Sequence, residues 1–211
     1  MRDPFHLSAV PTNQAGCTLF PGALDRGQQN ALVGSLRQLM KAAPLFQPVM
    51  PRTGKPLSVR MSNCGPLGWV ADKSGYRYQL THPVTGNPWP PMPQVLLNLW
   101  AAVAPDALGP QACLINWYAP DAKMGLHQDR DEETFDAPVV SISLGDDALF
   151  RLGGISRGGK TQGIRLSSGD VFLMGGEGRL AYHGVTRIYP GTSTLLDAPG
   201  RINLTLRRVN P

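Results

Sequence analysis

Two stretches of the chain repeat apolar residues at the spacing of an α-helix. The first covers residues 24–41, and the second follows Pro93 and stops near Pro105. In each stretch the apolar side chains recur three, four or seven residues apart, which places them on one helical face. The two stripes are Leu32, Leu36, Leu39 and Met40, and Leu96, Leu99, Trp100 and Val103. We therefore expect two amphipathic helices that pack on a core through these stripes.

From Ala112 onward the pattern changes to short runs of β-type residues. Glycine, serine and aspartate separate the runs, as in Gly145-Asp146-Asp147 and Ser168-Gly169-Asp170. Short strands at such spacing are typical of a β-sandwich or barrel. The expected strands are 113–118, 139–144, 148–152, 163–166, 171–174 and 202–207. The sequence predicts a mainly β fold of the α+β class, a jelly roll with two helices on its outside.

Between the predicted helices lies a stretch rich in proline, glycine, rings and cations. Its rings and cations include Arg52, Lys55, Arg60, Trp69, Lys73, Tyr76, Arg77 and Tyr78. We expect a loop and hairpin layer over about residues 44–92, beside a catalytic core at about 112–209. No internal repeat or linker divides the 211 residues, so residues 1–211 are predicted to form a single domain.

Charge and cysteine usage narrow the class of protein. Residues 1–100 hold nine Lys or Arg and three Asp or Glu, whereas residues 101–211 hold eleven and twelve. This basic first half fits a polyanionic partner, and it also fits a mildly basic soluble surface. Cys17, Cys64 and Cys113 have no metal-binding spacing, which favours reduced, buried thiols. Because no signal peptide and no run of about 20 apolar residues is present, we expect a cytoplasmic protein without membrane contact.

The triplet His127-Gln128-Asp129 is the strongest local sign of chemistry. In an extended segment, residues two apart point to the same side, so this imidazole and this carboxylate would face one point. A third ligand would come from another strand, and His183 is the candidate in the β-rich half. Two histidines and one carboxylate form the facial triad of non-heme Fe(II) oxygenases. Taken alone, the triplet also fits an ordinary hydrogen-bonded pair on the surface.

The last predicted strand alternates strictly between polar and apolar residues. Its polar face is formed by Arg201, Asn203, Thr205 and Arg207. An ordinary strand of this pattern would turn that face to water, but inside a barrel it would be a polar floor with two guanidiniums. Guanidinium binds carboxylate through paired hydrogen bonds, so this floor suits a dicarboxylate such as 2-oxoglutarate. A second pair of polar residues on one side of a strand is Asn116 and Tyr118.

Several motifs together carry a family resemblance. In the second half they are Leu114-Ile115-Asn116-Trp117-Tyr118-Ala119-Pro120, His127-Gln128-Asp129-Arg130-Asp131-Glu132, Tyr182-His183-Gly184 and Arg201-x-Asn203-x-Thr205-x-Arg207. In the first half they are Met61-Ser62-Asn63-Cys64-Gly65, Leu67-Gly68-Trp69, Gly75-Tyr76 and Asn87-Pro88-Trp89-Pro90. With this spacing, about residues 57–209 resemble the AlkB family, the alkylation-repair dioxygenases of nucleic acids. The likeness is closer to the bacterial repair enzymes than to the more distant demethylases.

The resemblance implies a fold, a cofactor set and a role for each motif residue. It implies a double-stranded β-helix core with an N-terminal nucleotide-recognition lid. The implied iron ligands are His127, Asp129 and His183, and the implied 2-oxoglutarate site comprises Asn116, Tyr118, Arg201, Asn203, Thr205 and Arg207. Arg207 would neutralise the carboxylate that chelates the iron, and Arg201 would bind the other end of the co-substrate. The implied substrate-binding residues are Trp69, Tyr76, Arg77, Tyr78, Asp131 and Arg157.

The reaction implied by the resemblance is the oxidative removal of alkyl groups from bases. The usual targets of the family are 1-methyladenine and 3-methylcytosine in DNA, and RNA is a further candidate. Fe(II), O₂ and 2-oxoglutarate would yield succinate and formaldehyde on a single strand or on a base flipped out of a duplex. A monomer is expected. The alternatives are a hydroxylase of a protein or small molecule, and an inactive nucleic-acid-binding module.

Overall fold

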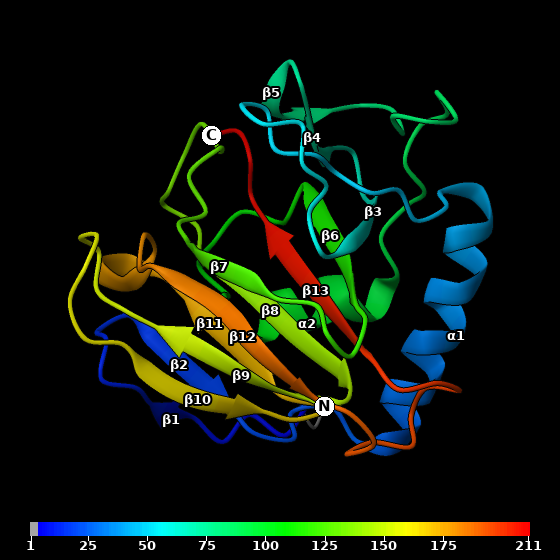
Figure 1. Cartoon of the computed structure of the whole chain (residues 1–211). Helices are drawn as coiled ribbons and strands as arrows, with labels where there is room; N and C mark the ends of the chain where they lie inside the picture. Colours follow the sequence, from blue (N-terminus) through cyan, green and yellow to red (C-terminus); the bar gives the residue numbers. More distant parts are fainter. Residues whose placement is uncertain (1–3) are drawn as a thin grey trace.

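The computed structural model describes residues 4–211, which form two facing β-sheets, a separate hairpin and two helices (Figure 1). The larger sheet has the order β1 (Val10–Pro11), β2 (Cys17–Phe20), β11 (Val171–Met174), β8 (Val139–Gly145), β13 (Arg201–Arg207), β6 (Ala112–Tyr118) and β3 (Arg60–Cys64). The smaller sheet has the order β10 (Gln162–Leu166), β9 (Asp147–Leu152), β12 (His183–Tyr189) and β7 (Met124–His127). All of these pairings are antiparallel, so the predicted jelly roll is confirmed.

Both predicted helices are present, as α1 (Arg26–Ala42) and α2 (Gln94–Val103). Helix α1 begins after Asp25, whose side chain accepts from the backbone N–H of Gln28 while the Gln28 side chain accepts from the backbone N–H of Asp25. This reciprocal capping box satisfies the free N–H groups of the first turn. Leu32 and Leu36 from the predicted stripe are buried. In Figure 1, α2 lies behind the larger sheet, and the smaller sheet lies in front of the larger sheet. No described helix is long and apolar enough to cross a membrane.

Strand β13 lies inside the larger sheet, between β8 and β6, and is buried on both faces. Leu204 and Leu206 on its apolar face are fully buried. On its polar face Arg201 and Arg207 are also buried, with 1% and 6% of their surface exposed. The prediction of a polar floor is therefore confirmed, because a solvent-facing strand would expose these guanidiniums.

The layer expected at residues 44–92 is divided between the core and a separate hairpin. Strand β3 pairs with β6 and so extends the larger sheet. Strands β4 (Gly68–Asp72) and β5 (Gly75–Gln79) form a two-stranded unit, called here the lid hairpin, that lies above this edge in Figure 1. Gly68 packs against the indole of Trp89, and a Cβ atom at this position would lie 2.3 Å from the ring. A side chain at Gly68 would therefore push the hairpin away from the core.

Candidate metal centre and co-substrate cleft

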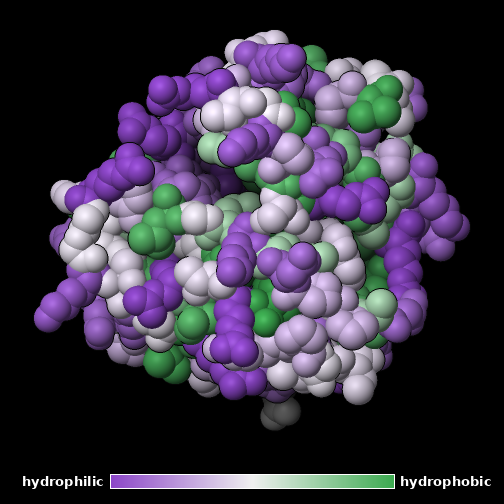
Figure 2. Space-filling model, in the orientation of Figure 1, coloured by the Kyte–Doolittle hydropathy of each residue, from purple (hydrophilic) through white to green (hydrophobic). Residues whose placement is uncertain are grey.

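A cleft of about 720 Å³ opens between the two sheets. Its walls come from the smaller sheet, the lid hairpin and the polar face of β13. Figure 2 shows a hollow in this face of the molecule with many hydrophilic residues around it. The cleft has the size of a small-molecule site and gathers residues that are far apart in the sequence.

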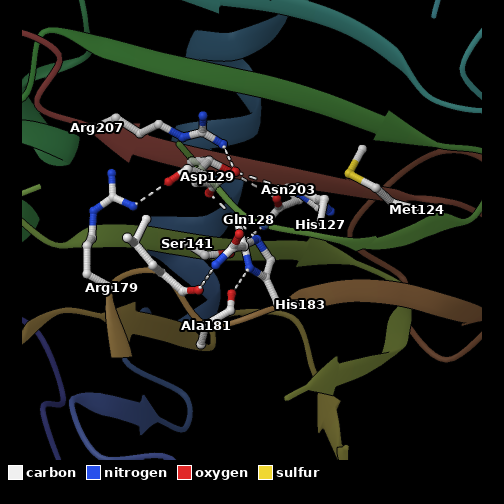
Figure 3. A network of polar contacts seen from close by, with 12 residues as sticks. Met124, His127, Gln128, Asp129, Ser141, Arg179, Ala181, His183, Asn203 and Arg207 are labelled. Atoms are coloured by element: carbon white, nitrogen blue, oxygen red, sulfur yellow. Dashed lines mark hydrogen bonds and ion pairs between the residues drawn. The ribbon is translucent and has the colours of Figure 1, made fainter. Parts of the chain in front are cut away.

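His127, Asp129 and His183 meet in the wall of the cleft (Figure 3). The His127 Nε2 atom lies 3.6 Å from Asp129 Oδ1, and His183 Nε2 lies 3.6 Å from Asp129 Oδ2. One ligand atom from each side chain lies within 4.8 Å of the other two. Two imidazoles and one carboxylate around one point match the facial triad that binds non-heme Fe(II).

The pairing of β7 with β12 brings the two histidines together. His127 and His183 are directly opposite each other in this antiparallel pair, and their ring centroids are 4.5 Å apart. The next residue on β12 is Gly184, where a Cβ atom would lie 2.5 Å from the carbonyl oxygen of Met124. Only glycine permits β7 to approach β12 this closely, so Gly184 helps to form the metal centre.

Backbone carbonyl groups fix the orientation of both imidazole rings. The Nδ1 atom of His127 lies 2.9 Å from the carbonyl oxygen of Gly125, and that of His183 lies 2.9 Å from the carbonyl oxygen of Ala181. Because a carbonyl oxygen only accepts, each Nδ1 carries the proton and donates it. Each Nε2 therefore presents a lone pair to the same point, as metal-binding histidines require.

The charge states at this centre also suit a cation. Burial lowers the pKa of His183 to about 4, so its imidazole is neutral at pH 7. Burial acts to raise the pKa of Asp129, but Arg207 and the two histidines outweigh burial and hold the pKa below its usual range. Oδ2 of Asp129 is buried without a hydrogen-bond partner among residues 4–211. A bound metal ion would give this oxygen the partner that it lacks.

Arg201 is a buried cation without a carboxylate partner in the described part of the chain. Its Nη2 atom donates to Ser143 Oγ at 2.6 Å, whereas its Nε atom has no hydrogen-bond partner. Burial lowers the pKa of Arg201 to about 10. Asn116 and Tyr118 line the same cleft, and the buried Oδ1 atom of Asn116 also lacks a hydrogen bond. A buried guanidinium needs a counter-charge, so this position fits the carboxylate of an anionic ligand.

Arg207 lies at the opposite end of the same strand face, next to the metal centre. Its Nη2 atom lies 2.6 Å from Asp129 Oδ1, and its Nη1 atom lies 3.0 Å from Glu132 Oε1. Its Nε atom has no hydrogen-bond partner among residues 4–211. Between the two arginines, Asn203 donates to Ser141 Oγ at 2.7 Å. Thr205 in turn donates to Asn203 at 3.1 Å, so the side chains of the floor hold one another in place.

The residues present therefore fit both an iron ion and a short dicarboxylate. The triad supplies ligands on one side of the metal, which leaves other positions open to a co-substrate and O₂. Of the six buried polar side-chain atoms that lack hydrogen bonds in residues 4–211, four belong to residues that line this cleft: Asn116, Asp129, Arg201 and Arg207. These atoms are the positions at which a ligand would complete the site.

Comparison with known proteins agrees with this geometry. Residues 16–207 match the 2OG-Fe(II) oxygenase superfamily. An alpha-ketoglutarate-dependent dioxygenase AlkB homolog of Caulobacter vibrioides is 50% identical over 202 residues, which are 96% of this chain and 90% of the relative. The alpha-ketoglutarate-dependent dioxygenase AlkB of Escherichia coli is 44% identical over 183 residues, 84% of this chain and 83% of the relative. The chain belongs to the AlkB family. It is an Fe(II)- and 2-oxoglutarate-dependent dioxygenase.

Solved structures agree with the assignment to the AlkB family. A structure titled "The structure of OsALKBH1" superposes with a TM-score of 0.83 at 31% identity, over 95% of this chain and 99% of that chain. An oxidoreductase of the 2OG-Fe(II) oxygenase family from Burkholderia pseudomallei shares the fold, with a TM-score of 0.53 at 16% identity. The predicted fold class and family are confirmed.

At the cleft mouth of this AlkB-family protein, the lid hairpin contributes two stacked rings. Trp69 and Tyr76 lie with ring centroids 5.6 Å apart and planes inclined by 15°. Trp69 Nε1 donates to Asp131 Oδ2 at 2.8 Å, which connects the hairpin to the segment that follows the metal ligands. Arg157 also lines the cleft. Four of the six predicted substrate-binding residues thus line the same cleft.

The other two predicted substrate-binding residues, Arg77 and Tyr78, are not among the residues that line the cleft. Arg77 forms an ion pair with Asp72 on the adjacent strand, with 2.8 Å between Nη2 and Oδ2. The hydroxyl of Tyr78 donates to Glu132 Oε1 at 2.6 Å and so points to the interior. Tyr78 follows two residues after Tyr76, and its hydroxyl also accepts from Arg207 on the floor of the site at 3.0 Å. A direct substrate contact for Arg77 and Tyr78 stays a prediction.

Two residues of the site were not among the sequence candidates. Glu132 and Arg179 are both buried, and Glu132 Oε2 lies 3.2 Å from Arg179 Nη2. Arg179 also donates through Nη1 to the carbonyl oxygen of Asp129 at 2.8 Å, as Figure 3 shows. Arg179 follows a short 3-10 helix, η1 (Gly176–Gly178), which has no periodicity that would mark the next side chain as buried. Glu132 follows the metal ligand Asp129 by three residues, and this short separation was the signal that could have marked Glu132 as part of the site.

Proposed function

We propose that this dioxygenase acts on bases alkylated at the pairing edge, such as 1-methyladenine and 3-methylcytosine, in DNA. Oxidative dealkylation of nucleic-acid bases is the activity that its AlkB relatives support. RNA is proposed as a second substrate class, because similar proteins include one named N6-methyladenosine RNA demethylase ALKB1 from Pyricularia oryzae and one named tRNA demethylase abh1 from Schizosaccharomyces pombe.

The observation that carries the proposal is the stacked ring pair in the same cleft as the metal centre. Trp69 offers a flat surface for a base removed from its stack, and Tyr76 supports the opposite face of the indole. Asp131 adds a carboxylate at the same opening, which favours a methylated base that carries positive charge. Arg157, which lines the same cleft, would contact phosphate.

In the proposed reaction, the residues of the protein mainly hold and orient the co-substrate and the base. O₂ is the oxidant, and the iron is where it would react. One oxygen atom enters succinate as 2-oxoglutarate loses CO₂, and the other oxygen atom hydroxylates the substrate. Arg201 and Arg207 would hold the two carboxylates of the co-substrate, and the lid hairpin would hold the flipped base over the triad. Hydroxylation of the N-methyl carbon is followed by loss of formaldehyde, which restores the base.

A hydroxylase of proteins or small molecules is the alternative within the same fold. The ring pair and the cations at residues 52–78 favour the nucleic-acid substrate, because a small molecule does not need such a surface. A non-catalytic binding module is disfavoured because no residue of the triad or of the arginine pair is missing. A monomer that works in the cytoplasm without membrane contact remains part of the proposal.

The test is formaldehyde release from matched DNA and RNA oligomers that carry one 1-methyladenine or 3-methylcytosine. We expect release from methylated DNA, and release from RNA at a comparable rate would support the second substrate class. If neither oligomer yields formaldehyde while the protein still consumes 2-oxoglutarate with a peptide or a small molecule, the substrate assignment is wrong.

A further inference from the structure

A buried polar cluster connects the lid hairpin to the floor of the cleft. Tyr78 enters it from β5, Arg207 from β13, and Glu132 from the segment after the metal ligands. The Tyr78 hydroxyl donates to Glu132 Oε1 at 2.6 Å and accepts from Arg207 Nη1 at 3.0 Å. The Glu132 side chain has no exposed surface. These bonds are therefore shielded from water, where a charge-assisted hydrogen bond is strongest.

The cluster leaves the Arg207 guanidinium little freedom to rotate. Nη1 donates to both Tyr78 and Glu132, and Nη2 contacts Asp129 Oδ1 at 2.6 Å. Because a guanidinium is planar, holding these two nitrogens also fixes the direction of Nε. That Nε is the atom of the group that has no hydrogen-bond partner within the described chain. The cluster thus orients the donor that remains available to a ligand.

The negative charge of Glu132 is balanced by two arginines rather than one. Arg179 Nη2 lies 3.2 Å from Glu132 Oε2 while Arg207 contacts Oε1. Glu132 therefore stays in place even if the bond from Tyr78 is removed, and Tyr78 is the member of the cluster that belongs to the hairpin. Movement of the hairpin away from the core would remove one of the two partners of Arg207 Nη1.

We propose that Tyr78 and Glu132 are positioning residues that orient Arg207, and that they couple the seating of the lid hairpin to the binding of 2-oxoglutarate. The inference rests on the proposed role of Arg207 as a partner of a co-substrate carboxylate. Coupling between two binding events is reciprocal. A seated hairpin raises the affinity for 2-oxoglutarate, and bound 2-oxoglutarate holds the hairpin against the core, where the base is received.

The first test measures 2-oxoglutarate binding by calorimetry, with Mn(II) in the metal centre so that no turnover occurs. We expect Tyr78→Phe to weaken binding by about fivefold or more, the lower end of typical coupling between sites. Tyr189→Phe is the matched control, because Tyr189 lies outside the cleft lining and packs its ring against Arg165 and Arg187. Glu132→Gln, which keeps the shape and removes the charge, should weaken binding as well.

The second test measures hydrogen exchange of the backbone at residues 68–79, with and without 2-oxoglutarate. In the wild type and in Tyr189→Phe, 2-oxoglutarate should slow exchange in the hairpin. In Tyr78→Phe, this slowing should be lost in addition to any fall in melting temperature that the missing buried hydrogen bonds cause. A residue with a merely structural role would change the melting temperature and would leave the effect of 2-oxoglutarate intact.

Arg207→Lys separates failure of this inference from failure of the proposed function. If Arg207→Lys weakens 2-oxoglutarate binding but Tyr78→Phe and Glu132→Gln retain wild-type affinity, the positioning role is wrong and the co-substrate site stands. If all three variants bind 2-oxoglutarate like the wild type, the assignment of Arg207 to the co-substrate is wrong too.

Discussion

Replacing Trp69 with alanine removes a partly buried indole that stacks on Tyr76 and donates to Asp131. We expect the main loss to fall on the nucleic-acid step. Stacking of a base on an aromatic side chain is worth about 1–3 kcal/mol by alanine substitution, or roughly 5- to 150-fold in affinity for the methylated oligomer. Trp69→Phe keeps a ring but loses the bond to Asp131, so it should retain part of that affinity.

For Trp69→Ala the structure also predicts a small loss of folding stability. The aromatic pair with Tyr76 is worth about 0.5–1.5 kcal/mol beyond its buried area. In a protein of this size, 1 kcal/mol shifts the melting temperature by about 2–4 °C. Truncation of a fully buried tryptophan would instead cost about 3–5 kcal/mol, because it leaves a cavity. The expected fall in melting temperature is therefore several-fold smaller if Trp69 stacks in the cleft than if it fills the core.

The assay uses one preparation of each variant for three measurements: the melting temperature, the decarboxylation of 2-oxoglutarate without substrate, and the demethylation of an oligomer. For Trp69→Ala we expect weak demethylation, decarboxylation close to wild type and a melting temperature lower by a few degrees. A fall of more than about 10 °C with parallel loss of both activities would refute the stacking role, because that outcome belongs to a core residue.

Three further predictions follow from the site. His183→Ala should weaken Fe(II) binding by more than about 100-fold, since loss of an outer partner of a ligand already costs about 10- to 100-fold, and the circular dichroism spectrum should stay native. Arg207→Lys should raise the KM for 2-oxoglutarate by about tenfold or more, since lysine lacks the planar fork that binds a carboxylate twice; an unchanged KM would remove Arg207 from the site. Burial raises the pKa of Cys17 to about 11, so at pH 8 the native protein should resist iodoacetamide at this thiol, and peptide mass spectrometry should find it alkylated after unfolding.

The sequence was most informative where one strand carries its own pattern. In β13 the alternation of Arg201, Asn203 and Arg207 with apolar residues gave the face of each side chain, and the structure places the polar face in the cleft. Helix α1 was predictable for a similar reason, since its apolar stripe and its Asp25 cap are both local features. In each case the information lies within one element and does not depend on its neighbours.

Other parts of the fold depend on contacts between distant segments. Strand β7 is a short edge strand with a largely exposed pattern, and its extended form is set by pairing with β12. The pairing of β12 is itself irregular, with shifts in register between His183 and Val185 and between Val185 and Arg187. Strand β3 joins the core sheet although it lies within the stretch expected as a lid. No period in the local sequence marks these strands.

The contacts of Tyr78 and Glu132 were also beyond the reach of the sequence. Tyr78 stands in a run of rings and cations that suggested contact with substrate. In the structure its hydroxyl meets a carboxylate 54 positions away and a guanidinium 129 positions away. Which of two neighbouring tyrosines faces the mouth and which faces the floor is decided by the seating of the lid hairpin on the core.

The most direct test of the account measures succinate and formaldehyde in the same reaction. Two DNA oligomers would be compared that differ in a single N1-methyl group on one adenine. With the unmethylated oligomer we expect only slow, uncoupled formation of succinate. With the methylated oligomer we expect more succinate, and formaldehyde in an amount equal to that excess. Equal succinate formation with both oligomers and no formaldehyde from either would contradict oxidative base dealkylation.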